Sequence, residues 1–165
     1  MKAIKPIAIL FLILVTSIIS AQDNYESELI SKFNKGVYIV AEVSDSNVKL
    51  KDSLTVTYKL YVSQDIGISN YNVQNHIENE DFEVEDINPS NTKIEYEFFK
   101  NEKYRFVILK KSVLKPKQKG QFKLEALALD VTAEIASKSN DAFGRLIMEK
   151  VNRTIKTDNI TINVI

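Results

Sequence analysis

Cysteine and tryptophan are absent from the 165 residues, and histidine occurs once. The lack of cysteine excludes disulfides, thiolate-bound metals, Fe–S clusters, a cysteine nucleophile and a lipoprotein anchor. Only four glycines are present, and they form no glycine-rich loop of the kind that holds phosphate groups. Neither sign of charge is in excess, because 22 basic residues balance 22 acidic ones. No overall field therefore attracts the chain to nucleic acid, and we expect no nucleic-acid partner.

One long apolar run is present, and it lies at the N-terminus. We predict that residues 1–21 are a secretory signal peptide, because Lys2 and Lys5 form a positive segment, residues 7–19 are apolar and small residues occupy 20–21. This run is too short to cross ~30 Å of hydrocarbon comfortably. An uncleaved N-terminal anchor is the alternative, because the isoleucine two positions before the cleavage point fits poorly there. We therefore expect an exported protein of the periplasm or envelope, with no membrane span in the mature chain.

Most of the remaining chain alternates apolar and polar residues. A period of two is typical of strands that bury one face and expose the other. In the run 122–131, Phe122 and Leu124 have one parity, whereas Leu127 and Leu129 have the other. This slip predicts a bulge near Ala126 or a strand that changes sheets. The predicted strands lie at 37–43, 54–62, 94–98, 104–114, 122–131 and 160–164.

Several such strands at short spacing predict an all-β fold. We expect an immunoglobulin-like antiparallel β-sandwich over residues 36–165 as one domain. Residues 22–35 are expected to form a linker or a short helix, because four apolar residues between 25 and 33 can share one helical face. A hairpin loop is predicted at 100–103, and a short turn of helix at 141–150.

No catalytic, cofactor or metal site is predicted. His76 is the only imidazole, and no serine lies in the G-x-S-x-G turn that a catalytic triad would use. The acidic run 78–86 lacks the spacing and central glycine of an EF-hand loop, so a solvated strand face is favoured over a Ca²⁺ site. The lysines between 110 and 119 lack accompanying arginine and have few interleaved aromatics, which argues against nucleic-acid recognition. They are interpreted as protection of an edge strand against aggregation.

A polar loop predicted at 136–145 contains the candidate partner-binding residues, which are Asp141, Phe143 and Arg145. Phe143 is followed by Gly144, and it either closes the end of the sandwich or is presented outward. Loops at the end of a sandwich, or an exposed strand edge, are the usual places at which such folds bind other chains.

Several segments resemble the first extracytoplasmic domain of the BatD family, the Bacteroides aerotolerance family. The most specific is the turn-and-strand pattern L-x-P-x-x-x-G-x-F-x-L, which is carried by Leu114, Pro116, Gly120, Phe122 and Leu124. The resemblance extends over residues 37–164. Its segments are, in order, GVYIVAEVSDSNVKLKDSLTVTYKLYV, DFEVEDINP, YRFVILKKSVLKPKQKGQFKLEALALDVTAEI, DAFGR and VNRTIKTDNITINV.

The resemblance implies an exported protein with tandem immunoglobulin-like domains, a later membrane span and no known enzyme activity. It also implies a scaffold in an envelope complex, encoded beside von Willebrand A-type proteins, tetratricopeptide proteins and a MoxR-type ATPase. The partners expected from the resemblance are envelope proteins, of which von Willebrand A-type or tetratricopeptide Bat proteins are the candidates. Asp141 is then a candidate to complete the metal site of a von Willebrand A partner in trans. Because the sequence stops at Ile165, we expect either a single-domain relative or a truncated product.

Two other functions stay open on the sequence. A glycan- or small-molecule-binding sandwich is the first, if Tyr38, Tyr61, Tyr71 and Phe99 form one exposed face on which sugars stack. A hydrolase is the second, and it lacks a visible nucleophile–base pair. The favoured hypothesis is a non-enzymatic β-sandwich that binds envelope proteins.

Overall fold

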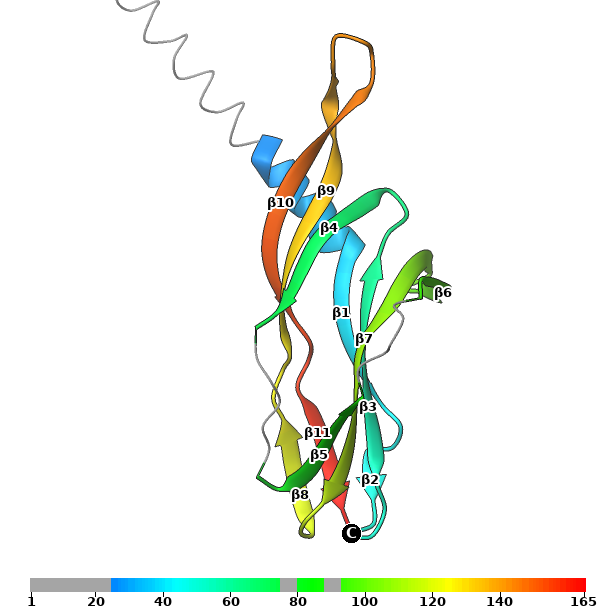
Figure 1. The fold of residues 1–165 in the computed structure, drawn as a ribbon, viewed down its shortest axis with the longest axis vertical. Helices are drawn as coiled ribbons and strands as arrows, with labels where there is room; N and C mark the ends of the chain where they lie inside the picture. The colour runs from blue at the N-terminus through cyan, green and yellow to red at the C-terminus, as the bar shows by residue number, and fades with distance from the viewer. Residues whose placement is uncertain (1–24, 75–79, 88–92) are drawn as a thin grey trace, which may run out of the picture.

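The computed structural model describes residues 25–74, 80–87 and 93–165, which form two β-layers and one helix (Figure 1). One layer is a five-stranded sheet. Four of its strands lie in the order β1 (Val37–Val43), β3 (Leu54–Val62), β7 (Glu102–Pro116) and β5 (Phe82–Ile87). The fifth strand, β6 (Glu95–Phe99), pairs with the first residues of β7. The other layer consists of two three-stranded sheets placed end to end. The first has the order β10 (Leu146–Lys156), β9 (Ala128–Asn140) and β4 (Ile66–Val73). The second has the order β2 (Asn47–Val48), β11 (Ile160–Val164) and β8 (Gly120–Leu124).

Of the strand pairs within the described ranges, only β2 and β11 run parallel. The predicted all-β antiparallel sandwich is therefore confirmed. The hairpin predicted at 100–103 is confirmed as well, because Lys100 and Asn101 form a two-residue turn between β6 and β7. Both turn residues have positive φ, 51° and 65°, which matches the twist of the flanking strands.

The core lies between the two layers, and the alternation of β3 and β9 builds much of it. A slip of one residue in either strand would turn its apolar side chains to solvent, so the buried face fixes the register. Burying one large aliphatic side chain contributes roughly 1.5–3 kcal/mol. The inward side chains are at most 5 % exposed on β3 and at most 2 % exposed on β9. On β3 they are Leu54, Val56, Tyr58, Leu60 and Val62, and on β9 they are Leu129, Val131, Ala133 and Ile135.

The predicted slip near Ala126 is a change of sheet. β8 pairs with β11, whereas β9, which begins four residues after β8 ends, pairs with β4 and β10. The connecting Leu127 is fully buried. Its backbone N–H donates to Thr157 Oγ1 at 3.0 Å, and the Thr157 N–H donates to the Leu127 carbonyl at 3.0 Å. Thr157 follows β10, so both chain crossings occur at the same level and are joined by reciprocal hydrogen bonds.

A helix at residues 25–36 precedes β1 and packs against the β9–β10 hairpin. Leu29 and Phe33 on its inner face are 7 % and 0 % exposed and belong to the main core. Glu28, which is partly exposed, pairs with Lys138 of β9 at 2.6 Å. The predicted signal peptide, residues 1–21, lies outside the described residues. Within the described ranges, no helix has the length and apolar character needed to cross a bilayer.

The structure corrects the predicted loop at 136–145 and the predicted helical turn at 141–150. β9 continues to Asn140 and β10 begins at Leu146, so only a short tip lies between them. The register shifts by one bulge in this region. Ser137 stabilises the bulge, because its hydroxyl accepts from the Ser139 N–H at 3.0 Å and donates to the Ser139 carbonyl at 3.1 Å. The β9–β10 hairpin is therefore longer than the apolar alternation predicts, because its added residues are polar and their side chains bond to the backbone.

The Leu127–Thr157 contact generates a first prediction. Thr157→Val keeps the shape of the side chain but leaves the buried Leu127 N–H without its acceptor, which costs about 1–3 kcal/mol. Urea unfolding followed by far-UV circular dichroism should show this loss in the free energy of unfolding. The matched control is Thr161→Val, at an exposed position of β11, which should change stability by less than about 0.5 kcal/mol. Equal effects of the two variants would contradict the role given to Thr157.

Candidate protein-binding surfaces

The β9–β10 hairpin projects beyond the body of the sandwich, and its tip is the first candidate site (Figure 1). The three residues predicted to bind a partner, Asp141, Phe143 and Arg145, all lie in this tip. The Asp141 N–H donates to the Arg145 carbonyl at 2.8 Å, and the Gly144 N–H donates to the Asp141 carbonyl at 3.0 Å. Gly144 has a φ of 78°, a conformation that glycine adopts without steric cost.

The Asp141 carboxylate holds this tip closed. Its Oδ1 accepts from the Phe143 and Arg145 backbone N–H groups, at 2.8 and 3.0 Å. Its Oδ2 accepts from Arg145 Nε at 2.8 Å and lies 2.8 Å from Arg145 Nη2. The backbone N–H of Arg145, and then that of Phe143, lower the pKa of the Asp141 carboxyl. Both oxygens are thus engaged within the loop, which speaks against Asp141 as a metal ligand for a partner.

The closed tip presents an apolar surface. Of the two orientations considered for Phe143, the structure has the outward one, because the side chain is 83 % exposed. The Arg145 guanidinium lies 5.4 Å from the centre of its ring. Leu146, Ile147 and Met148 follow at the start of β10 and are 61 %, 38 % and 47 % exposed. Sequence reasoning overlooked these three residues, although three consecutive apolar residues next to a polar loop were a usable signal.

The Asp141 contacts give a prediction for acid pH. Since the folded loop holds the charged carboxylate, closure is favoured above the ordinary pKa of an aspartate, ~3.9, and is lost as pH falls through the lowered folded value. Amide NMR spectra recorded from about pH 6 to about pH 2 should show the Phe143 and Arg145 N–H signals moving to random-coil positions. Asp141→Ala should give those positions at neutral pH, whereas Asp158→Ala should leave them unchanged.

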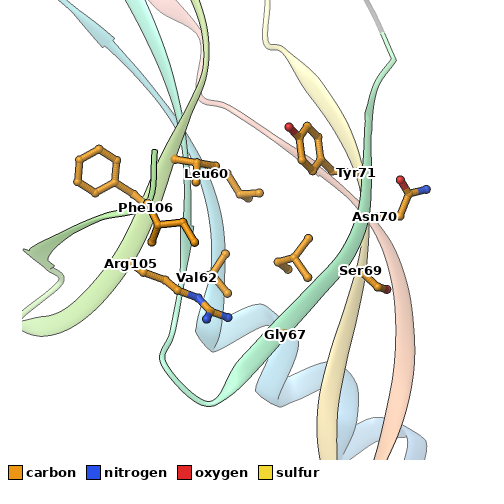
Figure 2. A pocket seen from close by; sticks show the side chains of 11 residues that line it. Leu60, Val62, Gly67, Ser69, Asn70, Tyr71, Arg105 and Phe106 are labelled. Carbon is orange, nitrogen blue, oxygen red and sulfur yellow. The ribbon is translucent and has the colours of Figure 1, made fainter. Parts of the chain in front are cut away.

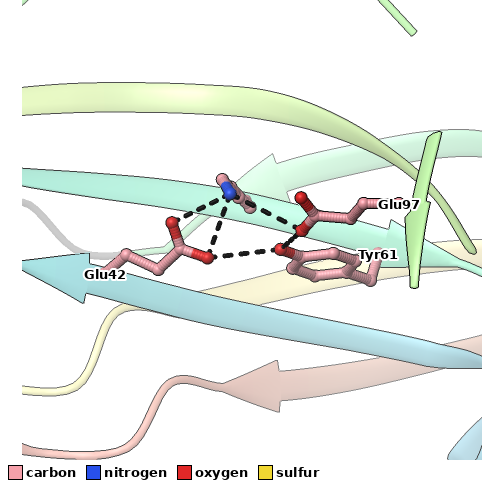
Figure 3. Close-up of polar contacts among 4 residues, drawn as sticks. Glu42, Tyr61 and Glu97 are labelled. Carbon is pink, nitrogen blue, oxygen red and sulfur yellow. Dashed lines mark hydrogen bonds and ion pairs between the residues drawn. The ribbon is translucent and has the colours of Figure 1, made fainter. Parts of the chain in front are cut away.

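A second prominent feature lies on the outer face of β3, where a polar network ties β6 to the sandwich (Figure 3). Lys59 Nζ lies 2.8 Å from Glu42 Oε2 and 3.6 Å from Glu97 Oε1. The Tyr61 hydroxyl donates to Glu97 and, at 3.3 Å, to Glu42. Burial and the hydrogen bond to Glu97 raise the pKa of Tyr61, so the phenol stays a neutral donor between two carboxylates.

Aromatic rings continue this network rather than forming a sugar-binding platform. Tyr61 stacks on Phe99 with ring centres 4.3 Å apart, and Tyr38 contacts the edge of Phe99 at 5.5 Å. Lys100 Nζ lies 3.7 Å from the centre of the Tyr38 ring. Tyr71, the fourth aromatic considered for glycan binding, lies on β4 in the opposite layer. The gathered rings therefore use their faces to pack against one another and to hold β6.

Lys59 supplies the positive charge that this network needs, which gives a third prediction. Lys59→Met removes the cation between Glu42 and Glu97 and should lower the free energy of unfolding by about 1 kcal/mol, since the pair is partly exposed. The double variant Lys59→Met with Glu97→Gln should recover most of this loss, because one of the facing carboxylates is gone. Urea unfolding measures both. Additive losses would contradict the proposed charge balance.

The other sequence features fall into structural positions. His76 lies outside the described residues. In the described part of the acidic run, Glu83 and Glu85 are exposed on β5 and alternate with Phe82 and Val84, as a solvated strand face requires. Throughout 25–74, 80–87 and 93–165, no three His, Cys, Asp or Glu side chains converge as a metal site would need.

The interpretation of the lysines as edge protection is wrong for β7. This strand lies between β3 and β5, not at an edge. A bulge next to Leu109 reverses its parity, so Lys110 pairs with Tyr58 and points inward. Lys110 is 8 % exposed, and its Nζ lies 2.7 Å from Asp86 Oδ2. The other oxygen, Asp86 Oδ1, accepts from the Ser112 hydroxyl at 2.7 Å. Burial, and then the charge of Asp86, raise the pKa of Tyr58 to about 12.

A family model described as the BatD DUF11-like domain matches residues 41–164. The matched range begins within β1 and ends with β11, so it includes both layers and the projecting hairpin. No curated protein matches the chain.

Proposed function

The chain belongs to the BatD family, and from this premise we propose that it is a non-enzymatic domain of the cell envelope that binds another protein through the tip of its β9–β10 hairpin. The N-terminal run predicted as a signal peptide supports export. The partner class comes from the family resemblance, which points to envelope proteins of the von Willebrand A or tetratricopeptide type.

One observation carries this proposal: the Phe143 side chain points outward and is 83 % exposed, while hydrogen bonds to the Asp141 carboxylate hold the loop that bears it. An exposed phenylalanine on a flexible loop would lose conformational freedom when it bound. Here the Asp141 carboxylate fixes the backbone on both sides of the ring before any partner arrives. Such preorganisation lowers the entropic cost of association. Aromatic anchors that enter a partner's pocket are typical of the residues that dominate interface energies.

The chemistry around Phe143 describes the complementary surface. Leu146, Ile147 and Met148 extend the apolar area along β10, and methionine adapts its shape to irregular pockets. Arg145 is 75 % exposed in its side chain although it pairs with Asp141, so part of its guanidinium is free to donate. The partner is thus expected to offer an apolar pocket with acidic or carbonyl groups at its rim.

The titratable groups support a binding role over a catalytic one. Among the residues that the structure describes, the groups with shifted pKa values are Glu28, Tyr58, Tyr61, Tyr104 and Asp141. Burial is the first cause of the shifts of the three tyrosines. Hydrogen bonds that hold the local structure, from Lys138 to Glu28 and from the Arg145 backbone to Asp141, are the first cause of the other two. A catalytic site would instead direct perturbed groups into one cleft.

Site-specific photo-crosslinking in intact cells tests the proposal and gives our fourth prediction. The full chain is produced in its native host with a benzophenone amino acid in place of Phe143 or, as the control, of Lys123. Lys123 is exposed on β8, near the opposite end of the molecule. We expect a discrete protein adduct in the envelope fraction from position 143 only.

Adding Asp141→Ala should remove that adduct, because the ring is no longer held outward. Adducts of equal yield from both positions, or none from position 143, would refute the tip as the binding site.

A further inference from the structure

A cleft of about 790 Å³ opens between the two layers, where β4 faces β3 and β7 (Figure 2). It lies away from the hairpin tip and from the polar network on the outer face of β3. Its floor is buried, since Leu60 and Val62 are 2 % and 5 % exposed, whereas Tyr71 at its margin is 43 % exposed. The apolar residues that line it include Leu60, Val62, Ile68, Tyr71, Ile94 and Val107.

The wall formed by β4 offers main-chain atoms as well as side chains. Within the described ranges, β4 pairs with β9 along one edge and with no strand along the other. Ser69 and Asn70 line the cleft, yet their side chains point away from it (Figure 2). Ser69 Oγ donates to the Thr132 carbonyl on the β9 side at 3.3 Å. An unpaired strand edge beside an apolar cleft is suited to accept another strand.

The opposite wall continues past the cleft onto β6. The pairing of Tyr96 with Arg105 and of Phe98 with Lys103 places these four side chains on the face of the sheet that also carries Val107. Tyr96 and Phe98 are 59 % and 80 % exposed, so no described element covers them. Lys103 Nζ lies 5.5 Å from the centre of the Tyr96 ring. The uncovered surface is therefore apolar and positively charged.

We infer that this cleft, together with the free edge of β4, binds an extended peptide segment of a partner protein. The segment adds beside β4 as a strand, and its alternate apolar side chains enter the space between the layers. Acidic residues in the segment meet Lys103 and Arg105. The Arg105 guanidinium is already oriented by a hydrogen bond to the Ile66 carbonyl at one end of the cleft.

Three properties of the site favour a peptide over a lipid or another small apolar molecule. The main chain of β4 supplies donors and acceptors in a row, which an acyl chain cannot use. The apolar surface is elongated, because it runs from the cleft along Tyr96 and Phe98. Lys103 and Arg105 lie two residues apart on β7. Side chains on one face of an extended peptide repeat at the same spacing, so two acidic residues of the peptide can face these two cations. This binding mode is independent of the hairpin tip.

The test uses the full chain and a fluorescein-labelled peptide with the sequence of residues 127–135, Leu-Ala-Leu-Asp-Val-Thr-Ala-Glu-Ile. This peptide alternates apolar residues and carries two carboxylates. Fluorescence anisotropy should show saturable binding. Phe98→Ser and Val107→Trp should each weaken it by about tenfold or more. Phe98 is exposed, so its replacement keeps the protein folded even where the tryptophan does not fit. Phe143→Ser, at the hairpin tip, should leave the affinity unchanged.

Two further peptides test the strand mode itself. A version with an N-methyl group on every main-chain nitrogen cannot donate main-chain hydrogen bonds from either edge and should not bind, and a shuffled version without alternation should not bind either. Absence of binding by the original peptide, or binding that both cleft variants and the shuffled order leave intact, overturns the inference. Saturable binding of cis-parinaric acid in place of the peptide also overturns it and identifies a lipid-type cleft. None of these outcomes bears on crosslinking at position 143.

Discussion

Burial of the inward faces of β3 and β9 against each other is the constraint on which the rest of this structure depends. Each strand contributes a row of apolar side chains that are almost entirely shielded from water, and the hydrophobic effect is the main source of their stabilisation. The remaining strands extend these two layers. The chain passes from one sheet of the second layer to the other at Leu127 and again at Thr157. Hydrogen bonds between these two residues satisfy buried backbone groups at the crossing, so both sheets of the layer can be built from the same two chain segments.

The two layers do not cover each other completely. The candidate binding surfaces lie at the margins where one layer extends past the other. At one end, β9 and β10 continue as a two-stranded hairpin, so Phe143 and Met148 have no layer opposite them. At one side, β6 extends the first layer past the edge of β4, so Tyr96 and Phe98 stay exposed. Large exposed apolar side chains cost solubility. Their concentration at two margins is therefore consistent with a domain that contacts neighbours.

Charged groups within the sandwich are matched to local partners. Lys110 is directed inward by a bulge, and Asp86 neutralises it from β5. Glu42 and Glu97 share Lys59 and the Tyr61 hydroxyl. Such pairs fix one arrangement of neighbouring strands, since removing one partner leaves an uncompensated charge. All of these residues lie within 41–164, the range that the BatD family model matches.

The sequence by itself determined the all-β class, the strands of regular alternation such as 54–62, the shift of parity near Ala126 and the grouping of Asp141, Phe143 and Arg145. These follow from periods and turn chemistry, which are local. β4 was missed because a bulge at Ser69 interrupts its alternation, and the hairpin extension because Ser137 and Ser139 are polar. Only the tertiary structure decided that Phe143 faces outward, that Lys110 faces inward and that a cleft borders β4. Each of these depends on which distant strand lies opposite, and that is set by packing between residues far apart in the chain.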